Sequence, residues 1–382
     1  MKIFLSFLQS EKQHNIPAYS FWQYYIKNGI EEAGHTWTEC RDVDWALGLV
    51  PKGREEQESW KTDAWTKTVD LVKRSKPDLF LSYLYPEQID VAAIAEIRNA
   101  GIPCINFFCD NVRNFRKAPA EYAAFDLNWV PEYGALNQYK QAGYPHINLP
   151  MPVWTPPAER MIHPENNEQL TFIGSHDGQR QQLLESLLER APETSLGLYG
   201  RGWVNESAAL PANRNTLGSL LRNQLRFVRA EGAAAYMRKL QQHGRSTPVN
   251  EALLSRYGGS PDSAQYQALT ASSRITLGIN RFPSFRFPAD RPHTYSRLRD
   301  LEAPLMGACY LTEYAPGIEQ LFDIDTEIRT YRNTEELAEQ IARLNHDAAL
   351  RLHMKQNGQR RVLANHTIGH SISKIKVHFG LA

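Results

Sequence analysis

The chain has 382 residues, of which 42% are hydrophobic and 22% are charged. This length is too great for one small core and indicates two domains of ordinary size. The formal net charge of +1 excludes the strongly basic surface typical of nucleic-acid-binding proteins and gives no sign of attraction to an acidic membrane. The four cysteines form no CxxC pair, which favours buried free thiols in a reducing compartment over a disulfide framework.

The first half of the chain alternates apolar strand patterns with helical patterns. Residues 2–8 form an apolar run too short to span a bilayer, and no convincing cleavage site follows, so we expect a first strand in a cytoplasmic protein. A helix over 18–33 that ends at Gly34, followed by a strand over 36–40, predicts the βαβ unit of a parallel sheet. Residues 41–60 are expected to leave the sheet. Further strands are expected at 77–84, 103–109, 127–130 and 147–149, and further helices at 62–75, 88–100 and 133–142.

A proline-rich run at 150–157 interrupts this pattern and predicts a linker, after which the alternation restarts. Residues 204–262 lose the alternation again, and a long helical pattern at 216–242 predicts an inserted helical segment. We therefore expect three parts: an N-terminal Rossmann-like domain over 1–155, a C-terminal Rossmann-like domain over 165–345 that carries the insertion, and terminal helices over 346–382.

The stretch over 297–313 predicts a helix that ends at Gly307 and leads into a buried strand. A polar, proline-rich loop with several cations precedes this helix. Free N–H groups and the helix dipole both attract anions at a helix start, so a cation-rich loop there favours a phosphate site. The cations of the loop are Arg281, Arg286, Arg291 and His293.

Five ordered motifs in the second half resemble the CgeB-like (spore-maturation-type) glycosyltransferases. They are Phe172-Ile-Gly-Ser175 with Arg180, Leu198-Tyr-Gly-Arg-Gly-Trp203, Arg297 to Ala308, Glu335 to Ile341, and Arg351 to Thr367. The resemblance implies an α/β chain of the GT-B fold, in which two doubly wound Rossmann-like domains face each other across a cleft. It also implies that the C-terminal domain holds a nucleotide-sugar donor, that the N-terminal domain holds the acceptor, and that the last helix crosses back to the N-terminal domain.

The function implied by the resemblance is transfer of a sugar from a nucleotide-diphosphate sugar to a glycan, a lipid-linked molecule or a protein. No cofactor besides the donor substrate and no metal site are expected, because arginines and a helix start can hold a diphosphate. The triplet Asp42-Val-Asp44 resembles the metal motif of another glycosyltransferase fold but does not follow a central strand. Two alternatives remain open: a sugar-nucleotide epimerase of the same fold, and a non-catalytic protein that binds nucleotide sugars.

The predicted donor site includes Glu302, which the family pattern assigns to the ribose hydroxyls. A carboxylate can accept two hydroxyl hydrogen bonds, and the alternative is a surface glutamate paired with Arg297 or Arg299. Related enzymes often carry a second glutamate eight residues earlier, where this chain has Thr294. The candidates for the diphosphate are Arg281, Arg286 and Arg297, since guanidinium groups fit phosphate oxygens; the alternative is solvated loop arginines.

Two small-residue turns complete the predicted donor site. Gly174, Ser175 and Arg180 lie between a strand and a helix, where small residues let a ligand approach backbone N–H groups. Gly200 and Gly202 follow the next strand and are expected to border the base pocket beside Trp203, unless they are ordinary turn glycines.

The predicted catalytic residues belong to the N-terminal half. Asp110 directly follows the apolar strand at 103–109, and ligands of open α/β sheets bind beyond the carboxyl ends of strands. Asp110 would orient or deprotonate an acceptor hydroxyl; the alternative is a turn or helix-cap residue. His14, in the loop after the first strand, is a second candidate.

Overall fold

The computed structural model describes residues 1–12, 14, 19–204, 224, 227–228, 232–244, 248–282, 287 and 292–381. The chain divides into two compact units. Unit 1 contains Met1–Glu159 and Arg361–Ala382, and unit 2 contains Arg160–Arg360. The last part of the chain therefore belongs to the same unit as its first part, and the first boundary lies just after the proline-rich run.

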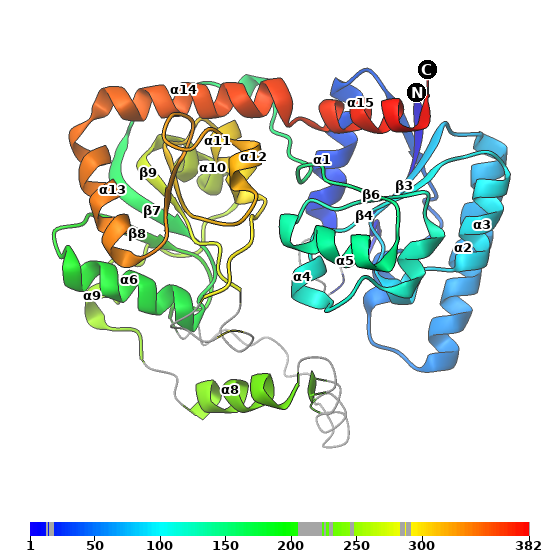
Figure 1. Cartoon of the computed structure of the whole chain (residues 1–382), viewed down its shortest axis with the longest axis horizontal. Helices are drawn as coiled ribbons and strands as arrows, with labels where there is room; N and C mark the ends of the chain where they lie inside the picture. Colours follow the sequence, from blue (N-terminus) through cyan, green and yellow to red (C-terminus); the bar gives the residue numbers. More distant parts are fainter. Residues whose placement is uncertain are drawn as a thin grey trace. The chain divides into compact units, whose positions relative to one another are not determined.

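Unit 1 is built on a parallel sheet of six strands in the order β2-β1-β3-β4-β5-β6 (Figure 1). Its central strands are buried on both faces, which is why the sequence shows continuous apolar runs there without alternation. The chain moves from β1 to β2 on one side and later to β3 on the other side. The strands are β1 (Lys2–Ser6), β2 (Thr36–Glu39), β3 (Leu79–Ser82), β4 (Cys104–Phe107), β5 (Leu127–Trp129) and β6 (His146–Ile147).

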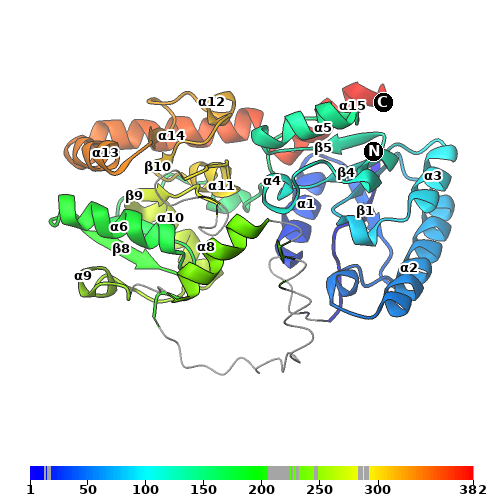
Figure 2. The same ribbon diagram turned by 60° about the horizontal axis from the view of Figure 1, so that its bottom comes forward.

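The helices of unit 1 follow the strands in the usual crossover arrangement. They are α1 (Tyr19–Glu32), α2 (Arg54–Ser75), α3 (Val91–Asn99), α4 (Asn111–Asn114), α5 (Leu136–Ala142) and α15 (Ile368–Phe379). Short 3-10 turns lie at Ala46–Leu49, Pro86–Gln88, Ala120–Ala124, Tyr133–Ala135 and Pro157–Glu159. Helices α2 and α3 lie side by side, and α15 lies beside α1 (Figures 1 and 2). The Ile368 side chain is so close to Gly29 that a Cβ on Gly29 would lie 2.3 Å from it.

Residues 41–60 leave the sheet, as expected, but they still pack into unit 1. Trp45 is fully buried and meets Trp60 and Trp65 edge-on at ring distances of 5.9 and 5.2 Å. Helix α2 begins at Arg54, before the predicted start at 62. Its first turn carries Glu55 and Glu56, which suit a helix start. The polar composition of residues 54–61 concealed this first part of the helix.

Unit 2 is built on a parallel sheet of five strands in the order β11-β10-β9-β7-β8. The strands are β7 (Asn167–Ile173), β8 (Leu196–Tyr199), β9 (Ser273–Gly278), β10 (Tyr310–Glu313) and β11 (Arg329–Tyr331). Strand β7 is the point at which the chain order reverses, because β8 lies on one side of it and β9 on the other. Ligands of open α/β sheets bind beyond the carboxyl ends of the strands at such a point.

The helices of unit 2 are α6 (Gly178–Arg190), α8 (Ala233–Gly244), α9 (Glu251–Leu254), α10 (Ser263–Ser272), α11 (Arg299–Leu305), α12 (Ile318–Leu321), α13 (Thr334–His346) and α14 (Ala348–Asn365), whose last residues fall in unit 1. One sheet face contributes leucine and isoleucine side chains to a core with α6 and α13. The other face is polar: Thr276 bonds a carbonyl of α10, and Tyr310 bonds a carboxylate of α11.

The predicted insertion at 204–262 also differs in its last part. Leu253 of α9 is fully buried in the core, and Tyr257 pairs with Leu198 of β8 as a short parallel bridge. Residues 250–259 thus extend the edge of the sheet and are not an excursion from it. Of the helical pattern at 216–242, the structure describes α8, and most of the remainder lies outside the described residues.

Candidate active site

The carboxyl edge of the unit 2 sheet gathers three arginines around the end of β7. Arg299 donates from its guanidinium to the carbonyl of Ile173, the last residue of β7. Arg180, from the first turn of α6, donates to the carbonyl and the hydroxyl of Ser175 at 2.8 and 3.3 Å. Arg297 stacks on the Tyr295 ring at 4.5 Å.

The three arginines differ in how their charges are compensated. Burial disfavours the charged form of Arg299, but Tyr266 and Glu302 outweigh this effect and raise its pKa. Burial and the nearby charges of Arg297 and Arg299 lower the pKa of Arg180 to about 10, against the opposing effect of Asp177. One Arg297 guanidinium nitrogen donates to the Arg281 carbonyl at 2.5 Å, while its Nε is buried with no hydrogen-bond partner among the described residues. A buried donor without a partner is costly, and an anion at this position would relieve both effects.

Arg281 has a different environment. Its Nε donates to Glu313 Oε1 at 2.8 Å, and both side chains are buried. Burial raises the pKa of Glu313, and the charge of Arg281 opposes this shift. Arg281 also donates to the Gln179 carbonyl at 3.4 Å, and so joins the ends of β9 and β10 to the start of α6. Its predicted role at the diphosphate stays a prediction. Arg286 and Arg291 lie outside the described residues.

The start of α11 is fixed by a buried carboxylate that the sequence did not single out. Asp300 is fully buried and accepts hydrogen bonds from the Arg297 backbone N–H at 3.0 Å and from Asn280 at 3.1 and 3.2 Å. Burial raises its pKa, and these hydrogen bonds oppose the shift. Its other donors are Ser296, Tyr310 and Thr312. This network determines where the backbone presents Arg297 and Arg299.

Glu302 lies two residues later on α11 and is only 6% exposed. It accepts a hydrogen bond from the hydroxyl of Tyr266 on α10, and Arg299 lies over the Tyr266 ring at 5.2 Å. Burial and the negative charge of Glu302 raise the pKa of Tyr266, while Arg299 opposes them. Pro304 lies in the same helix, as the sequence shows. Glu302 is thus a buried residue linked to α10 and not an exposed surface glutamate.

The two glycine turns lie against each other. A Cβ on Gly200 would lie 2.3 Å from the Gly174 carbonyl oxygen, and the φ of Gly200 is +123°, so only glycine fits there. Gly202 lies close to His176 of the first turn. Trp203 is 2% exposed and donates to the Gly174 carbonyl at 2.7 Å, so its ring is part of the core. These glycines hold two loops together, and a role in ligand binding stays a prediction.

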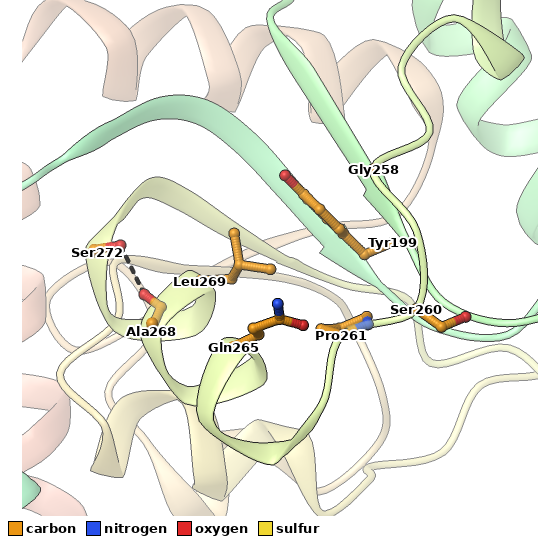
Figure 3. Close-up of a pocket in the computed structure, with 8 residues that line it drawn as sticks. All are labelled: Tyr199, Gly258, Ser260, Pro261, Gln265, Ala268, Leu269 and Ser272. Carbon is orange, nitrogen blue, oxygen red and sulfur yellow. Dashed lines mark hydrogen bonds between the residues drawn. The ribbon is translucent and has the colours of Figure 1, made fainter.

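A pocket of about 370 Å³ lies between the end of β8 and α10. Figure 3 shows the Tyr199 ring facing Gln265 and Leu269 of α10, with Ser260 and Pro261 nearby. The other side of the ring is covered by Gly258, where a Cβ would lie 2.3 Å from it. Tyr199, the residue before Gly200, therefore borders this pocket, whereas the predicted base pocket beside Trp203 stays a prediction.

The carboxyl edge of the unit 1 sheet carries the two predicted catalytic residues. Asp110 follows β4 and occupies the N-cap position of α4, but its side chain makes no capping hydrogen bond. Asp110 thus has the position of a helix-cap residue without the capping hydrogen bond, and its role as a base stays a prediction. Glu132, which follows β5, accepts the backbone N–H of Val112 at 3.2 Å in its place.

His14 follows β1 and forms a pair with Asp44. The His14 Nε2 lies 2.7 Å from Asp44 Oδ2, and Asp44 Oδ1 accepts the Leu47 backbone N–H at 2.8 Å. A carboxylate that holds an imidazole in this way fixes its orientation, as in other acid–base pairs. Asp44, considered in the sequence only as part of a metal triplet, is a partner of the predicted His14.

Among the residues that the structure describes, no helix has the length and apolarity needed to cross a membrane. The same residues contain no group of three or more His, Cys, Asp or Glu side chains arranged to hold a metal ion. The four cysteines are all buried and free.

Known proteins resemble this chain in sequence and in fold. Residues 179–376, just over half of the chain, match the model of a family described as glycosyl transferase-like. The chain belongs to this family. No curated protein matches the sequence significantly.

Solved structures share the whole fold at low sequence identity. A sucrose-phosphate synthase from Thermosynechococcus elongatus has a TM-score of 0.58 at 12% identity, with 99% of this chain and 98% of that chain covered. A glycosyltransferase from Rickettsia africae has a TM-score of 0.57 at 9% identity, with coverage of 100% and 98%. HepE from Anabaena, solved with UDP and glucose, has a TM-score of 0.53 at 12% identity, with 99% of both chains covered.

These matches confirm the predicted fold class: the chain is α/β, has two parallel sheets with helices, and matches glycosyltransferases of the GT-B fold. The predicted membership of a glycosyltransferase family is confirmed at the level of the glycosyl transferase-like family. The narrower CgeB-like assignment stays a prediction, as do the donor and acceptor roles of the two units.

Proposed function

We propose that this protein is a glycosyltransferase that moves a sugar from a nucleoside diphosphate sugar to a hydroxyl group of an acceptor. The observation that carries the proposal is the group formed by Arg180, Arg297 and Arg299 at the carboxyl end of β7. Burial, together with the nearby positive charges of Arg297 and Arg299, lowers the pKa of Arg180 to about 10. A diphosphate is the ligand part that would match such a group.

The remaining parts of the donor would lie along the same edge of unit 2. Glu302, held by Tyr266, would accept hydrogen bonds from the ribose hydroxyls. The base would lie against Tyr199 in the pocket beside α10, because an aromatic ring offers a stacking surface for any base. HepE, solved with UDP and glucose, shares the fold, which supports a nucleotide as the ligand without naming the base.

The proposed reaction needs a base on the acceptor side. The acceptor oxygen attacks the anomeric carbon, the bond from that carbon to the phosphate oxygen breaks, and the nucleoside diphosphate leaves with the negative charge. Arginines that contact the diphosphate stabilise this charge as it develops. Asp110 would take the proton of the acceptor hydroxyl. His14, oriented by Asp44, is the second candidate for this role. The acceptor class, whether glycan, lipid-linked molecule or protein, stays open.

Incubation with nucleotide sugars, first without and then with an acceptor, tests the proposal against its two rivals. A panel of UDP-, GDP-, dTDP- and ADP-sugars would be followed by chromatography, first without an acceptor and then with simple sugar, lipid and peptide acceptors. We expect slow release of nucleoside diphosphate without an acceptor and faster release with a suitable one. An epimer formed without an acceptor would overturn the transferase in favour of an epimerase. Binding of a donor with no turnover under any condition would favour the non-catalytic protein.

A further inference from the structure

The first turn of α4 is held by side chains from three segments of unit 1. Asn111 donates to the Phe108 carbonyl at 2.7 Å and accepts from the Tyr139 hydroxyl of α5 at 2.7 Å. Glu132 accepts the Val112 backbone N–H from the segment after β5. All three of these side chains are buried. The backbone at Asp110 is thereby fixed without any contribution from its own carboxylate to the cap.

Glu132 is unusual among these residues because its carboxyl group is nearly removed from water. It is 1% exposed, and its Oε1 has no hydrogen-bond partner among the described residues. Burial, and next the negative charge of Asp110, raise the pKa of Glu132 to about 8, while the backbone N–H groups of Val112 and Asn111 oppose the shift. Burial raises the pKa values of Cys109 and Tyr139, and an ionised Glu132 would raise them further, so both groups are neutral at pH 7.

We propose that Glu132 is a positioning residue for Asp110: it takes the helix-capping role that Asp110 leaves, and its buried Oε1, which has no hydrogen-bond partner among the described residues, favours the neutral carboxyl group. This inference rests on the proposed function, in which Asp110 is the base. Glu132 is too deeply buried to touch a substrate, so it acts through α4 and by adding no second negative charge beside Asp110.

The physical reason is that two carboxylates close together cannot both ionise without a large cost, and the more buried one keeps its proton. Asp110, which is half-buried, then carries the single negative charge of this edge. A base needs that charge in order to accept a proton. If Glu132 were ionised instead, its charge would repel that of Asp110, and its buried Oε1 would carry negative charge without contact with water.

The first test needs no substrate. Because Glu132 binds its proton more tightly in the folded protein than in the unfolded chain, its contribution to stability is fully present below about pH 4.5 and is lost as pH rises through about pH 8. Glu132→Gln keeps an oxygen that can accept the Val112 N–H but cannot ionise. The melting temperature of Glu132→Gln relative to wild type should therefore rise by several degrees between pH 6 and pH 9.5. Asp110→Asn should shift this rise to lower pH, as one of the two charges is then absent.

The second test uses release of nucleoside diphosphate from whichever nucleotide sugar the panel shows to be turned over. Glu132→Gln should stay within about threefold of wild type at pH 7, whereas Glu132→Ala, which loses the cap, should lower kcat roughly 10- to 100-fold with little change in KM for the donor. If the melting temperatures of wild type and Glu132→Gln depend on pH in the same way, the claim that Glu132 is protonated at neutral pH is wrong. Equal rates for Glu132→Ala and wild type would overturn the positioning role. If Asp110→Asn is fully active while the melting result holds, the proposed function fails at Asp110 and the proton on Glu132 stands.

Discussion

The carboxyl edges of the two sheets are built from opposite charges. The edge of unit 2 holds Arg180, Arg297 and Arg299, and burial with the neighbouring positive charges lowers the pKa of Arg180 to about 10. The edge of unit 1 holds Asp110 and Glu132, and burial with the negative charge of Asp110 raises the pKa of Glu132 to about 8. At both edges, burial and a neighbouring like charge disfavour the ionised form of one group.

The difference between the edges suggests what would relieve each of them. A surplus of guanidinium groups is relieved by an anion, such as the diphosphate of a donor. A surplus of carboxylates is relieved by a proton, such as the one that an acceptor hydroxyl loses. The same fold thus holds opposite electrostatic conditions in its two halves, and the following substitutions either remove one side of this contrast or leave it unchanged.

The largest effect is expected at the acceptor edge. Asp110→Asn keeps the shape of the side chain but removes the proposed base, so the rate of transfer should fall by about 10²- to 10⁴-fold. The melting temperature shift produced by the donor should stay the same, because Asp110 belongs to unit 1 and not to the donor edge. Asp63→Asn, at an exposed position of α2, is the matched control and should leave the rate unchanged. A fully active Asp110→Asn would transfer the role of base to His14.

Arg297→Met should weaken donor binding by about 10- to 100-fold, the usual value of one charge-assisted hydrogen bond. Calorimetric titration with the nucleoside diphosphate of the turned-over donor measures this change. Arg190→Met is the control, because Arg190 lies on α6 with Arg180 but is exposed and paired with Glu335. Equal weakening in both variants would mean that only net charge matters and that the arginine group is not a site.

Gly200→Ala tests whether the two loops of the donor edge must touch. A side chain there meets the Gly174 carbonyl and requires an unfavourable φ, so unfolding free energy should fall by about 1–3 kcal/mol. Chemical denaturation measures this fall. Gly53→Ala is the control, since Gly53 has open space and an ordinary φ; it should cost less than Gly200→Ala, and only through the poorer N-cap of α2. A neutral Gly200→Ala would show that the loops can separate.

The smallest effect is expected for Tyr266→Phe, which removes the hydroxyl that Glu302 accepts. The net loss of one such bond corresponds to about 0.5–1.5 kcal/mol, and the donor affinity should fall by roughly 2- to 10-fold, toward the lower end if a water replaces the hydroxyl. Tyr314→Phe removes a similar Tyr–Glu bond at the surface and should leave affinity unchanged. If only nucleosides that contain ribose lose affinity, the ribose assignment of Glu302 is supported; a uniform lack of change contradicts it.

The sequence predicted the fold class because a parallel sheet has a clear signature. Runs such as Leu79–Ser82 and Cys104–Phe107 are buried on both faces, and glycines end the helices between them. The sequence-based assignment failed where an element buries only one side or packs through aromatic rings. Helix α2 is an example, because its polar residues obscure the contacts of Trp65. The assignment also failed at residues 250–259, because a two-sided core position such as Leu253 lies in a segment with no regular period.

Candidate residues could be named from the sequence only where one residue carries the signal. Arg297 and Glu302 stand out beside a helix start, but Asp300, Tyr266 and Glu132 contribute through partners that are far away in sequence. The partner of Tyr266 lies 36 positions later, and that of Glu132 lies 20 positions earlier. No local pattern encodes such pairs. Asp300 could have been noticed as a second carboxylate on the short helix that carries Glu302.

The central claim is that the arginine group at the end of β7 binds a nucleoside diphosphate. The most direct test is the melting temperature of wild type, Arg297→Met and Arg190→Met with UDP, GDP, dTDP and ADP, since a ligand that binds only the folded state raises its apparent stability. We predict that at least one of these nucleotides raises the melting temperature of wild type and Arg190→Met, and that Arg297→Met loses most of this rise. No shift with any nucleotide, or an undiminished shift in Arg297→Met, would contradict the account.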